Sequence, residues 1–468
     1  MKVKLGQLLS IVKNLMMINN KIIFGVLLFI TFFFFLLFCE VPIGNEIYRN
    51  ECLLLFCLFG AAVFLDLFIL KSSIPMLGLL SFFLLLSFSL PLFFIKADFL
   101  QLTGNITLAL KYALIGYFCF FLGFGLVVFS AKGTRFSLIK DLNNDTMKIR
   151  LLALLCLLIY YFTKIGVLSF VTQFREPAIL IYVALNIGFI ARKLNVSKIE
   201  KITFWLVLVS EIIIRSLDGL LAYIIIFLIF VFSILFFFGS LKKSLVIFSF
   251  VLLYLIGFFM NPIKHYYRAE VWYNTAQTGE LGVVDRFQKI LDLNQRVADG
   301  KLIKSDDEKD RESFLWRFSY QIGALALVVQ QTPLNIPYWN GSTYSVFSKF
   351  IPRFLWKDKP KEEMGYKFGT EYGILSKDNR STSMNTPIVV ESYMNFGLLG
   401  VTLVMFLIGL VFGRLNLFVN NNIIDPWSKC IHFAILFPTV QHESNFSLVF
   451  GGVFLNALFV FLIVKILK

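Results

Sequence analysis

Histidine, cysteine and charged residues are all scarce in this chain of 468 residues. It has three histidines and six cysteines, and none of them falls in the spacing of a zinc site. A metal-dependent active site is therefore not expected. Charged residues make up 16% of the chain and hydrophobic residues 58%, with a mean hydropathy of +0.78. Soluble domains hold about 45–50% apolar residues, so the composition indicates an integral membrane protein.

The apolar runs predict about twelve transmembrane helices. A run needs about 20 apolar residues to cross a bilayer, and shorter runs are expected to extend into flanking polar residues. The first run ends in Glu-Val-Pro, without the small residues of a signal-peptide cleavage site, so it is expected to remain as an anchor. The predicted spans are residues 22–39, 52–70, 74–95, 106–130, 151–162, 178–191, 202–214, 219–238, 245–260, 393–412, 427–440 and 446–464.

Charge predicts the orientation of these spans. With both termini in the cytoplasm, the inner segments hold 19 Lys and Arg against 4 Asp and Glu. The insert at residues 261–392 holds 18 against 16, and the short outer segments with the spans hold 7 against 9. The net charge of +15 is therefore a positive-inside signal, and no nucleic-acid surface is needed to explain it.

The insert at 261–392 is predicted to lie outside the cytoplasm. It is too long for a simple connection, and such loops are usually functional. A helix is expected near residues 283–297, a second amphipathic or re-entrant helix should end before Pro333, and residues 338–344 should form a turn. We expect one domain, 1–468: an all-α polytopic membrane protein with about twelve transmembrane helices and a large, partly helical extracytoplasmic insert before the tenth span.

Basic and aromatic residues alternate at residues 345–360, in the sequence SVFSKFIPRFLWKDKP. Arginine presents a planar fork to phosphate oxygens, and aromatic rings favour the headgroup level of a membrane. Arg353 is predicted to bind an anionic lipid carrier or a leaving pyrophosphate, and an interfacial arginine that only reaches out to water is an equal alternative. Lys357, Lys359 and Trp356 are candidate contacts to the same substrate, and for the two lysines ordinary contacts to lipid headgroups are the alternative.

Arg215 is the second candidate cation. It lies at membrane depth by sequence, where ionisable residues are costly and point to function. A helix pair with Glu211, or with Asp218, is the alternative reading.

Carboxylates near the tenth and last spans are candidate proton acceptors. Glu391 precedes the tenth span and is predicted to accept a proton from a sugar hydroxyl, or else to orient the helix start. Glu443 has the same two readings before the last span. Arg380, in the insert, is a weaker candidate for a phosphate contact.

A series of motifs between about residues 311 and 413 resembles a known family. The series holds YWNGSTY at 338–344, IPRFLWKDKP at 351–360, SMNTP at 383–387 and ESYMNFG at 391–397. It resembles bacterial O-antigen polymerases, the oligosaccharide repeat-unit polymerases. The lysines at 357, 359 and 361 and the charged segment at 301–311 depart from that pattern.

The resemblance implies a glycosyltransferase in the bacterial inner membrane, with its site on the periplasmic face. Such enzymes join undecaprenyl-diphosphate-linked oligosaccharide units into a polymer and need neither a nucleotide sugar nor a cofactor. The implied partners are the lipid-linked oligosaccharide, membrane lipid and a chain-length regulator protein, with no nucleic acid. In the mechanism we expect, Arg353 and Arg215 neutralise the leaving pyrophosphate and Glu391 takes the proton of the attacking hydroxyl.

Two alternatives remain at this stage. An O-antigen ligase has a similar layout but hands its glycan to the lipid A core. A transporter or flippase also suits twelve spans, but such proteins usually show related halves and broken helices, which the sequence does not display.

Overall fold

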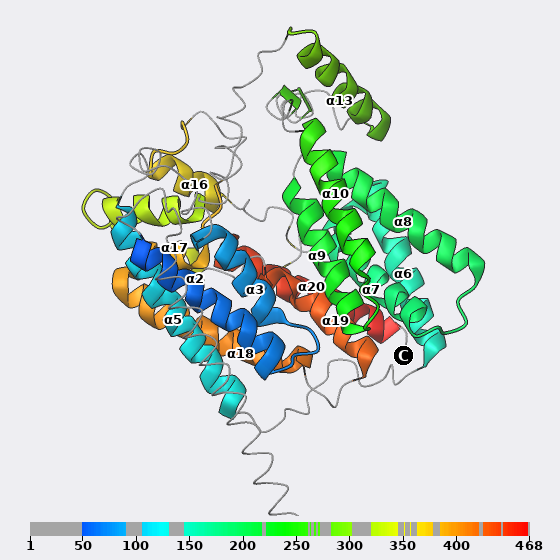
Figure 1. The fold of residues 1–468 in the computed structure, drawn as a ribbon, viewed down its shortest axis with the longest axis horizontal. Helices are drawn as coiled ribbons and strands as arrows, with labels where there is room; N and C mark the ends of the chain where they lie inside the picture. Colours follow the sequence, from blue (N-terminus) through cyan, green and yellow to red (C-terminus); the bar gives the residue numbers. More distant parts are fainter. Residues whose placement is uncertain are drawn as a thin grey trace, which may run out of the picture.

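The computed structural model describes residues 49–89, 105–130, 145–217, 221–260, 263, 266–267, 270–271, 282–301, 320–344, 351, 356, 363–377, 384–420, 425–440 and 443–466. Within these residues the chain is 82% helical and contains no strand. The all-α prediction is therefore confirmed for the described part of the chain. Figure 1 shows the helices arranged as a bundle, with α13 and α16 beyond one of its ends.

The helices coincide with the predicted apolar runs. Short segments of 3₁₀ or π geometry carry the label η. The first half of the chain contains α2 (Arg49–Phe64), η2 (Leu65–Ile69), α3 (Met76–Leu84), η3 (Leu85–Ser89), α5 (Ile106–Ser130), α6 (Thr146–Lys164), η5 (Ser169–Phe174), α7 (Arg175–Ala191), α8 (Lys198–Leu217), α9 (Leu221–Phe237) and α10 (Lys243–Met260). The second half contains α13 (Val283–Ala298), η7 (Ser342–Tyr344), α16 (Met364–Glu371), α17 (Ile388–Leu399), η8 (Gly400–Val404), α18 (Met405–Asn420), α19 (Pro426–Leu436), η9 (Phe437–Val440) and α20 (Phe446–Ile466).

Six helices of the described residues are long and apolar enough to cross a membrane. They are Asn50–Ile69, Ile106–Ser130, Thr146–Lys164, Thr172–Ala191, Ile388–Asn420 and Phe446–Lys465. Two shorter apolar helices, Met76–Ser89 and Tyr223–Phe237, accompany them. A helix occupies each predicted span from the second onwards, while the first, at 22–39, lies outside the described residues. The chain is thus a helical membrane protein by length and composition, and the count of twelve stays a prediction.

The predicted breaks between helices are found where polar residues and proline interrupt the apolar pattern. Helix α8 ends at Leu217 and α9 begins at Leu221, so two helices occupy the predicted spans 202–214 and 219–238, and Arg215 lies in the last turn of α8. A helix also covers residues 320–331 and ends just before the Thr332–Pro333 peptide bond. Its buried residues, among them Leu325 and Val328, belong to the main hydrophobic core.

Glycine lets α5 and α18 approach each other at backbone distance. A Cβ atom at Gly409 would overlap the carbonyl oxygen of Phe120, and one at Gly123 would overlap that of Phe406. Gly413, one turn beyond Gly409, is also tightly placed, because a Cβ atom there would lie 3.1 Å from the carbonyl oxygen of Phe124. Small residues at this spacing are the usual device for packing helices in lipid, where no hydrophobic force draws the helices together. The pair α5–α18 therefore forms the tightest part of the bundle.

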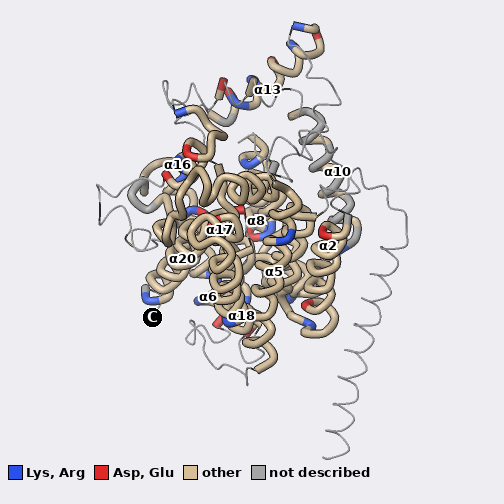
Figure 2. Tube along the Cα trace, turned by 90° about the vertical axis from the view of Figure 1, so that its left-hand side faces the viewer, with Lys and Arg blue, Asp and Glu red and all other residues tan. Residues whose placement is uncertain are grey.

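Charged residues gather away from the middle of the bundle. Figure 2 shows both signs of charge on α13 and α16, whereas most of the bundle beneath them is uncharged. Helix α13 packs through Leu293 and Val297 on a small separate core that includes Met260, at the end of α10, and Tyr267. The described parts of the insert thus lie at one end of the bundle, as the sequence predicts for a segment between two spans.

Candidate functional site

Three polar side chains are fully buried in the first part of α17. Glu391, Ser392 and Asn395 each have an exposed fraction of 0%. Buried polar groups are stable only when they are hydrogen-bonded. Their partners therefore show which segments this helix start holds together.

The YWNGSTY turn packs on this helix start through Asn395. The Asn395 side chain donates to the hydroxyl of Thr343 at 2.6 Å and accepts from the backbone N–H of Gly341 at 2.8 Å. The backbone adds a bond from Trp339 N–H to the carbonyl of Met394 at 3.1 Å. Two motifs some 50 positions apart in the chain thus form one hydrogen-bonded cluster, which we call the α17 cluster.

Gly397 bends the chain inside α17. Its φ of 59° and ψ of −139° lie outside the helical region, in a conformation that only glycine adopts without strain. A Cβ atom at this position would lie 2.6 Å from the hydroxyl oxygen of Tyr338. Glycine in ESYMNFG is therefore required twice, by the backbone angle and by the close approach of the turn.

Glu391 fastens the start of α20 to α17. Its Oε2 accepts a hydrogen bond of 2.7 Å from the backbone N–H of Phe446, the first residue of α20. The first N–H groups of a helix have no partner within the helix, and the helix dipole favours a negative charge there. Glu443 lies three residues before Phe446 and is half-buried. Glu391 thus contacts the start of α20 from α17, and Glu443 stands just before that start in the chain, so both predicted carboxylates lie near the beginning of α20.

Aromatic rings cover the α17 cluster. Tyr344 stacks on Phe396 with 6.3 Å between ring centroids and meets Phe446 edge to face at 5.2 Å. Burial, followed by the negative charge of Glu391, raises the pKa of the Tyr344 phenol. The ammonium of Lys367, on α16, lies 4.4 Å from the centre of the Trp339 ring. Aromatic faces and a cation therefore border the buried polar groups.

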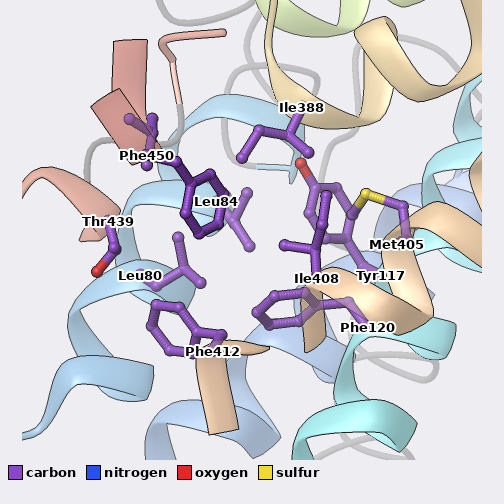
Figure 3. Close-up of a pocket in the computed structure, with 11 residues that line it drawn as sticks. Leu80, Leu84, Tyr117, Phe120, Ile388, Met405, Ile408, Phe412, Thr439 and Phe450 are labelled. Carbon is purple, nitrogen blue, oxygen red and sulfur yellow. The ribbon is translucent and has the colours of Figure 1, made fainter. Parts of the chain in front are cut away.

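An apolar cavity of about 40 Å³ adjoins the α17 cluster, among α3, α5, α17, α18 and α20. Ile388 is the first residue of α17, three positions before Glu391, and the ring of Phe450 packs at a tilt against that of Phe446, with ring centroids 4.4 Å apart. Figure 3 shows that Leu84 and Tyr117 also face this space. The cluster therefore has hydrocarbon surface on its bundle side.

Arg215 lies in a second cluster, the Arg215 cluster, formed by α6, α7 and α8. Its Nε donates to Glu211 at 3.1 Å, and its Nη2 lies 2.9 Å from both carboxylate oxygens of Glu176. Glu211 is 3% exposed and also accepts from the hydroxyl of Tyr160 and from Lys164 at 3.5 Å. Two cations thus face two carboxylates, and the helix pair considered as the alternative reading of Arg215 is present.

The guanidinium group of Arg215 also lies over the ring of Phe227 on α9, 4.6 Å from its centroid. The described partners of Arg215 come from α7, α8 and α9, and those of Glu391 from the loops and α20. The structure therefore places the two predicted catalytic residues in different clusters of the described residues. That Arg215 and Glu391 act on one substrate stays a prediction.

Most of the predicted phosphate-binding residues fall outside the described residues. They are Arg353, Lys357 and Lys359 of the basic segment at 345–360, and Arg380. Trp356 is described, and its side chain is 38% exposed. Within the part of the chain that the structure describes, no group of three or more His, Cys, Asp and Glu could hold a metal ion.

Several contacts were missed by sequence reasoning. Glu176 was not among the candidates, although its place in the first turn of a helix is typical for an acidic residue. Asn395, Thr343 and Lys367 were also missed as site residues. Asn395 and Thr343 stand inside the motifs that carried the resemblance, so a search within those motifs for side chains able to bond backbone would have found them.

The chain belongs to the DUF8712 family, described as a domain of unknown function, whose model matches residues 68–468. No curated protein matches the chain. No solved structure matches it either.

Proposed function

We propose that this member of the DUF8712 family is a membrane glycosyltransferase that polymerises undecaprenyl-diphosphate-linked oligosaccharide units on the outer face of the bacterial inner membrane. The observation that carries the proposal is the α17 cluster. The YWNGSTY and ESYMNFG motifs resemble those of repeat-unit polymerases, and they are hydrogen-bonded to each other at the end of the bundle near the insert. In this proposal the chain has about twelve spans, both termini are cytoplasmic and the insert is periplasmic.

The proton of the attacking hydroxyl needs an acceptor near the cluster. Glu391 is fully enclosed, and one of its oxygens is engaged by the Phe446 N–H. Glu443 belongs to the same helix start and is half-buried, so a substrate reaches it more easily. We therefore assign Glu443 the role of proton acceptor and Glu391 the role of positioning residue that sets where α20 begins.

The leaving diphosphate needs positive charge. Arg353 remains our first candidate, because an arginine between aromatic residues combines a bidentate fork with an interfacial position. Arg215 is the second candidate. Its outer partner Glu176 is 57% exposed and presents two oxygens at 2.9 Å, much as a phosphate group would. A diphosphate would therefore take the place of Glu176, while Glu211 keeps the guanidinium oriented.

The rest of the substrate would meet two kinds of surface. Trp339 and Tyr338 are half-buried beside Lys367 and offer aromatic faces to a sugar ring. A lipid tail would not fit the apolar cavity of about 40 Å³ beside Ile388, so it would lie on apolar side chains outside the bundle, such as Leu398 and Leu399 of α17, which are 48% and 68% exposed. Both surfaces lie on or beside α17, next to the start of α20, where we place the reaction.

The proposal is tested with purified protein in liposomes and lipid-linked saccharide extracted from cells that lack this chain. Wild-type protein is expected to convert this extract into a ladder of longer products on a gel. Glu443→Gln is expected to lower the rate by about 100-fold or more, the usual contribution of a general base, and to remove the acidic limb of the pH profile, where protonation of the base stops the reaction. Glu391→Gln is expected to keep activity because its amide oxygen still accepts from the Phe446 N–H, whereas Glu391→Ala should lose it.

The matched control is Asp299→Asn, which neutralises an exposed carboxylate at the end of α13 that pairs with Lys301 at 3.0 Å. It is expected to behave as the wild type. Absence of any elongation by wild-type protein would refute the polymerase function. A normal ladder from Glu443→Gln together with an inactive, well-folded Glu391→Gln would return the proton-accepting role to Glu391.

A further inference from the structure

Helix α13 uses only part of its apolar surface to pack on the protein. Leu293 and Val297 are buried against Met260, Ile263 and Tyr267. Its charged residues are paired along another face, where Lys289 contacts Glu270, and Arg296 contacts Asp292 at 2.7 Å. The helix therefore packs on the end of α10 through one face and forms ion pairs on another face.

A third face of α13 is apolar and exposed. Val284, Phe287 and Leu291 are 67%, 54% and 55% exposed. Their spacing of three and then four residues places them in one line along the helix. Large apolar side chains lined up in this way are costly to leave in water, at about 25 cal/mol for each Å² of apolar surface. Something other than water is expected to cover this stripe.

The position of α13 favours lipid as the cover. The helix packs on Met260, the last residue of α10, and it also contacts α8. Helix α10 has its own exposed line at the same spacing, with Phe248, Val251 and Leu255 at 62%, 50% and 45% exposure. In a membrane helix such a line faces the acyl chains. The stripe of α13 thus ends, at Leu291, beside the residues that pack on the end of α10, close to where the lipid-facing line of α10 ends.

The size of the stripe argues against a protein partner. Three side chains of this kind present on the order of 400 Å² together, since even a large aromatic residue buries only about 150–250 Å². A stable protein interface buries about 1,200–2,000 Å² in total. A bilayer has no such minimum, because each apolar side chain gains separately by entering the boundary between headgroups and acyl chains.

We propose that α13 lies in the headgroup layer of the membrane surface next to α10, with Val284, Phe287 and Leu291 inserted into the acyl boundary. The helix carries three basic and two acidic residues, so apolar burial provides the attraction and anionic lipid adds little. This placement holds whether or not the chain is a glycosyltransferase. It would fix the height of the insert above the bilayer.

The test places a fluorescent label on one cysteine in full-length protein that lacks the six native cysteines. One variant carries Phe287→Cys, on the stripe, and the matched control carries Asp292→Cys, on the charged face of the same helix, where the native side chain is 46% exposed. Both are reconstituted into phosphatidylcholine liposomes with or without brominated acyl chains. The bromolipid is expected to quench the label at position 287 about twofold or more beyond that at 292, and iodide in the buffer should show the reverse order.

Leu291→Cys and Val284→Cys repeat the measurement on the same stripe, so a poorly folded variant at one position does not decide the result. Equal exposure to iodide at 287, 291 and 292 would overturn the proposal. A label at 287 that is shielded from iodide but not quenched by bromolipid would also overturn it, because a protein segment or a second copy would then cover the stripe.

Discussion

The α17 cluster and the Arg215 cluster both bury a charged side chain near a helix end, but they satisfy it differently. Arg215 is surrounded by ionic partners, and its cluster of two cations and two carboxylates is balanced. Glu391 instead accepts from the backbone at the start of α20, within a cluster built from neutral hydrogen bonds. Ion pairs hold the helices of the Arg215 cluster together. Hydrogen bonds hold the turn at 338–344 and the helices α17 and α20 together in the α17 cluster.

The difference shows that burial of a charged side chain does not by itself reveal its role. A buried ion pair is weak evidence for either stability or chemistry, because the desolvation of two charges offsets much of their attraction. The identity of the partner groups determines which interaction a substitution removes. Loss of one charge from the Arg215 cluster leaves another charge buried, whereas loss of one group from the α17 cluster frees the turn that carries Trp339.

Arg215→Met should have the largest effect, a loss of about 3–5 kcal/mol in the free energy of unfolding, because Glu211 is left buried without its guanidinium group. Tryptophan fluorescence during thermal unfolding in detergent measures it. The double variant Arg215→Met/Glu211→Leu removes both charges and is expected to regain much of the loss. A single variant as stable as the wild type would show that this cluster is not held by charge.

Gly397→Ala is expected to cost about 1–3 kcal/mol, because alanine must adopt a conformation that only glycine accepts easily and must displace Tyr338. The same unfolding experiment detects the change. Gly60→Ala is the control, since no atom lies within 4 Å of the added methyl group. It is expected to be neutral or slightly stabilising. Equal stability of the two variants would mean that the bend does not depend on glycine.

Asn395→Leu is expected to cost about 1–3 kcal/mol, because the N–H of Gly341 and the hydroxyl of Thr343 lose their buried partner. Asn186→Leu is the matched control, since that side chain donates within its own helix, to the carbonyl of Tyr182 at 2.9 Å. Limited proteolysis of the turn at 338–344 checks the structural reason. Unchanged protection of the turn in Asn395→Leu would show that its backbone contacts suffice.

Glu176→Gln should have the smallest effect on stability, under about 1 kcal/mol, because an exposed ion pair is screened by water and salt. Its effect on activity sharpens the comparison. If Arg215 binds the diphosphate, the variant should lower the KM of the lipid-linked substrate without a loss of kcat. A higher or unchanged KM would assign the Arg215 cluster to structure alone.

Local features of the fold followed from the sequence because they depend on neighbouring residues. Apolar runs located the helices, Pro333 ended the helix at 320–331, and the four-residue spacing of Glu211 and Arg215 suggested their pair. The helix α13 and the turn at 338–344 were also predicted correctly. Each of these depends on residues within about one or two helical turns.

Contacts between distant segments could not be predicted in the same way. Glu391 meets Phe446, 55 positions away, and Arg215 meets Glu176, 39 positions away. Periodicity shows which face of a helix is apolar but not which helix will lie against it. The bend at Gly397 was missed as well, because a glycine at the end of a motif has the same sequence signature whether it bends a helix or only makes room.

The glycine contacts between α5 and α18 also bear on how the protein is made. Ser130 and Met405 are 275 positions apart in the chain, yet the tightest helix pair joins these two segments. At about 5–20 residues per second, a ribosome needs roughly 14–55 s to make the intervening chain. During that time α5 resides in the bilayer with its glycine face open to lipid or to temporary neighbours. Assembly of the membrane core must therefore wait for the last quarter of synthesis.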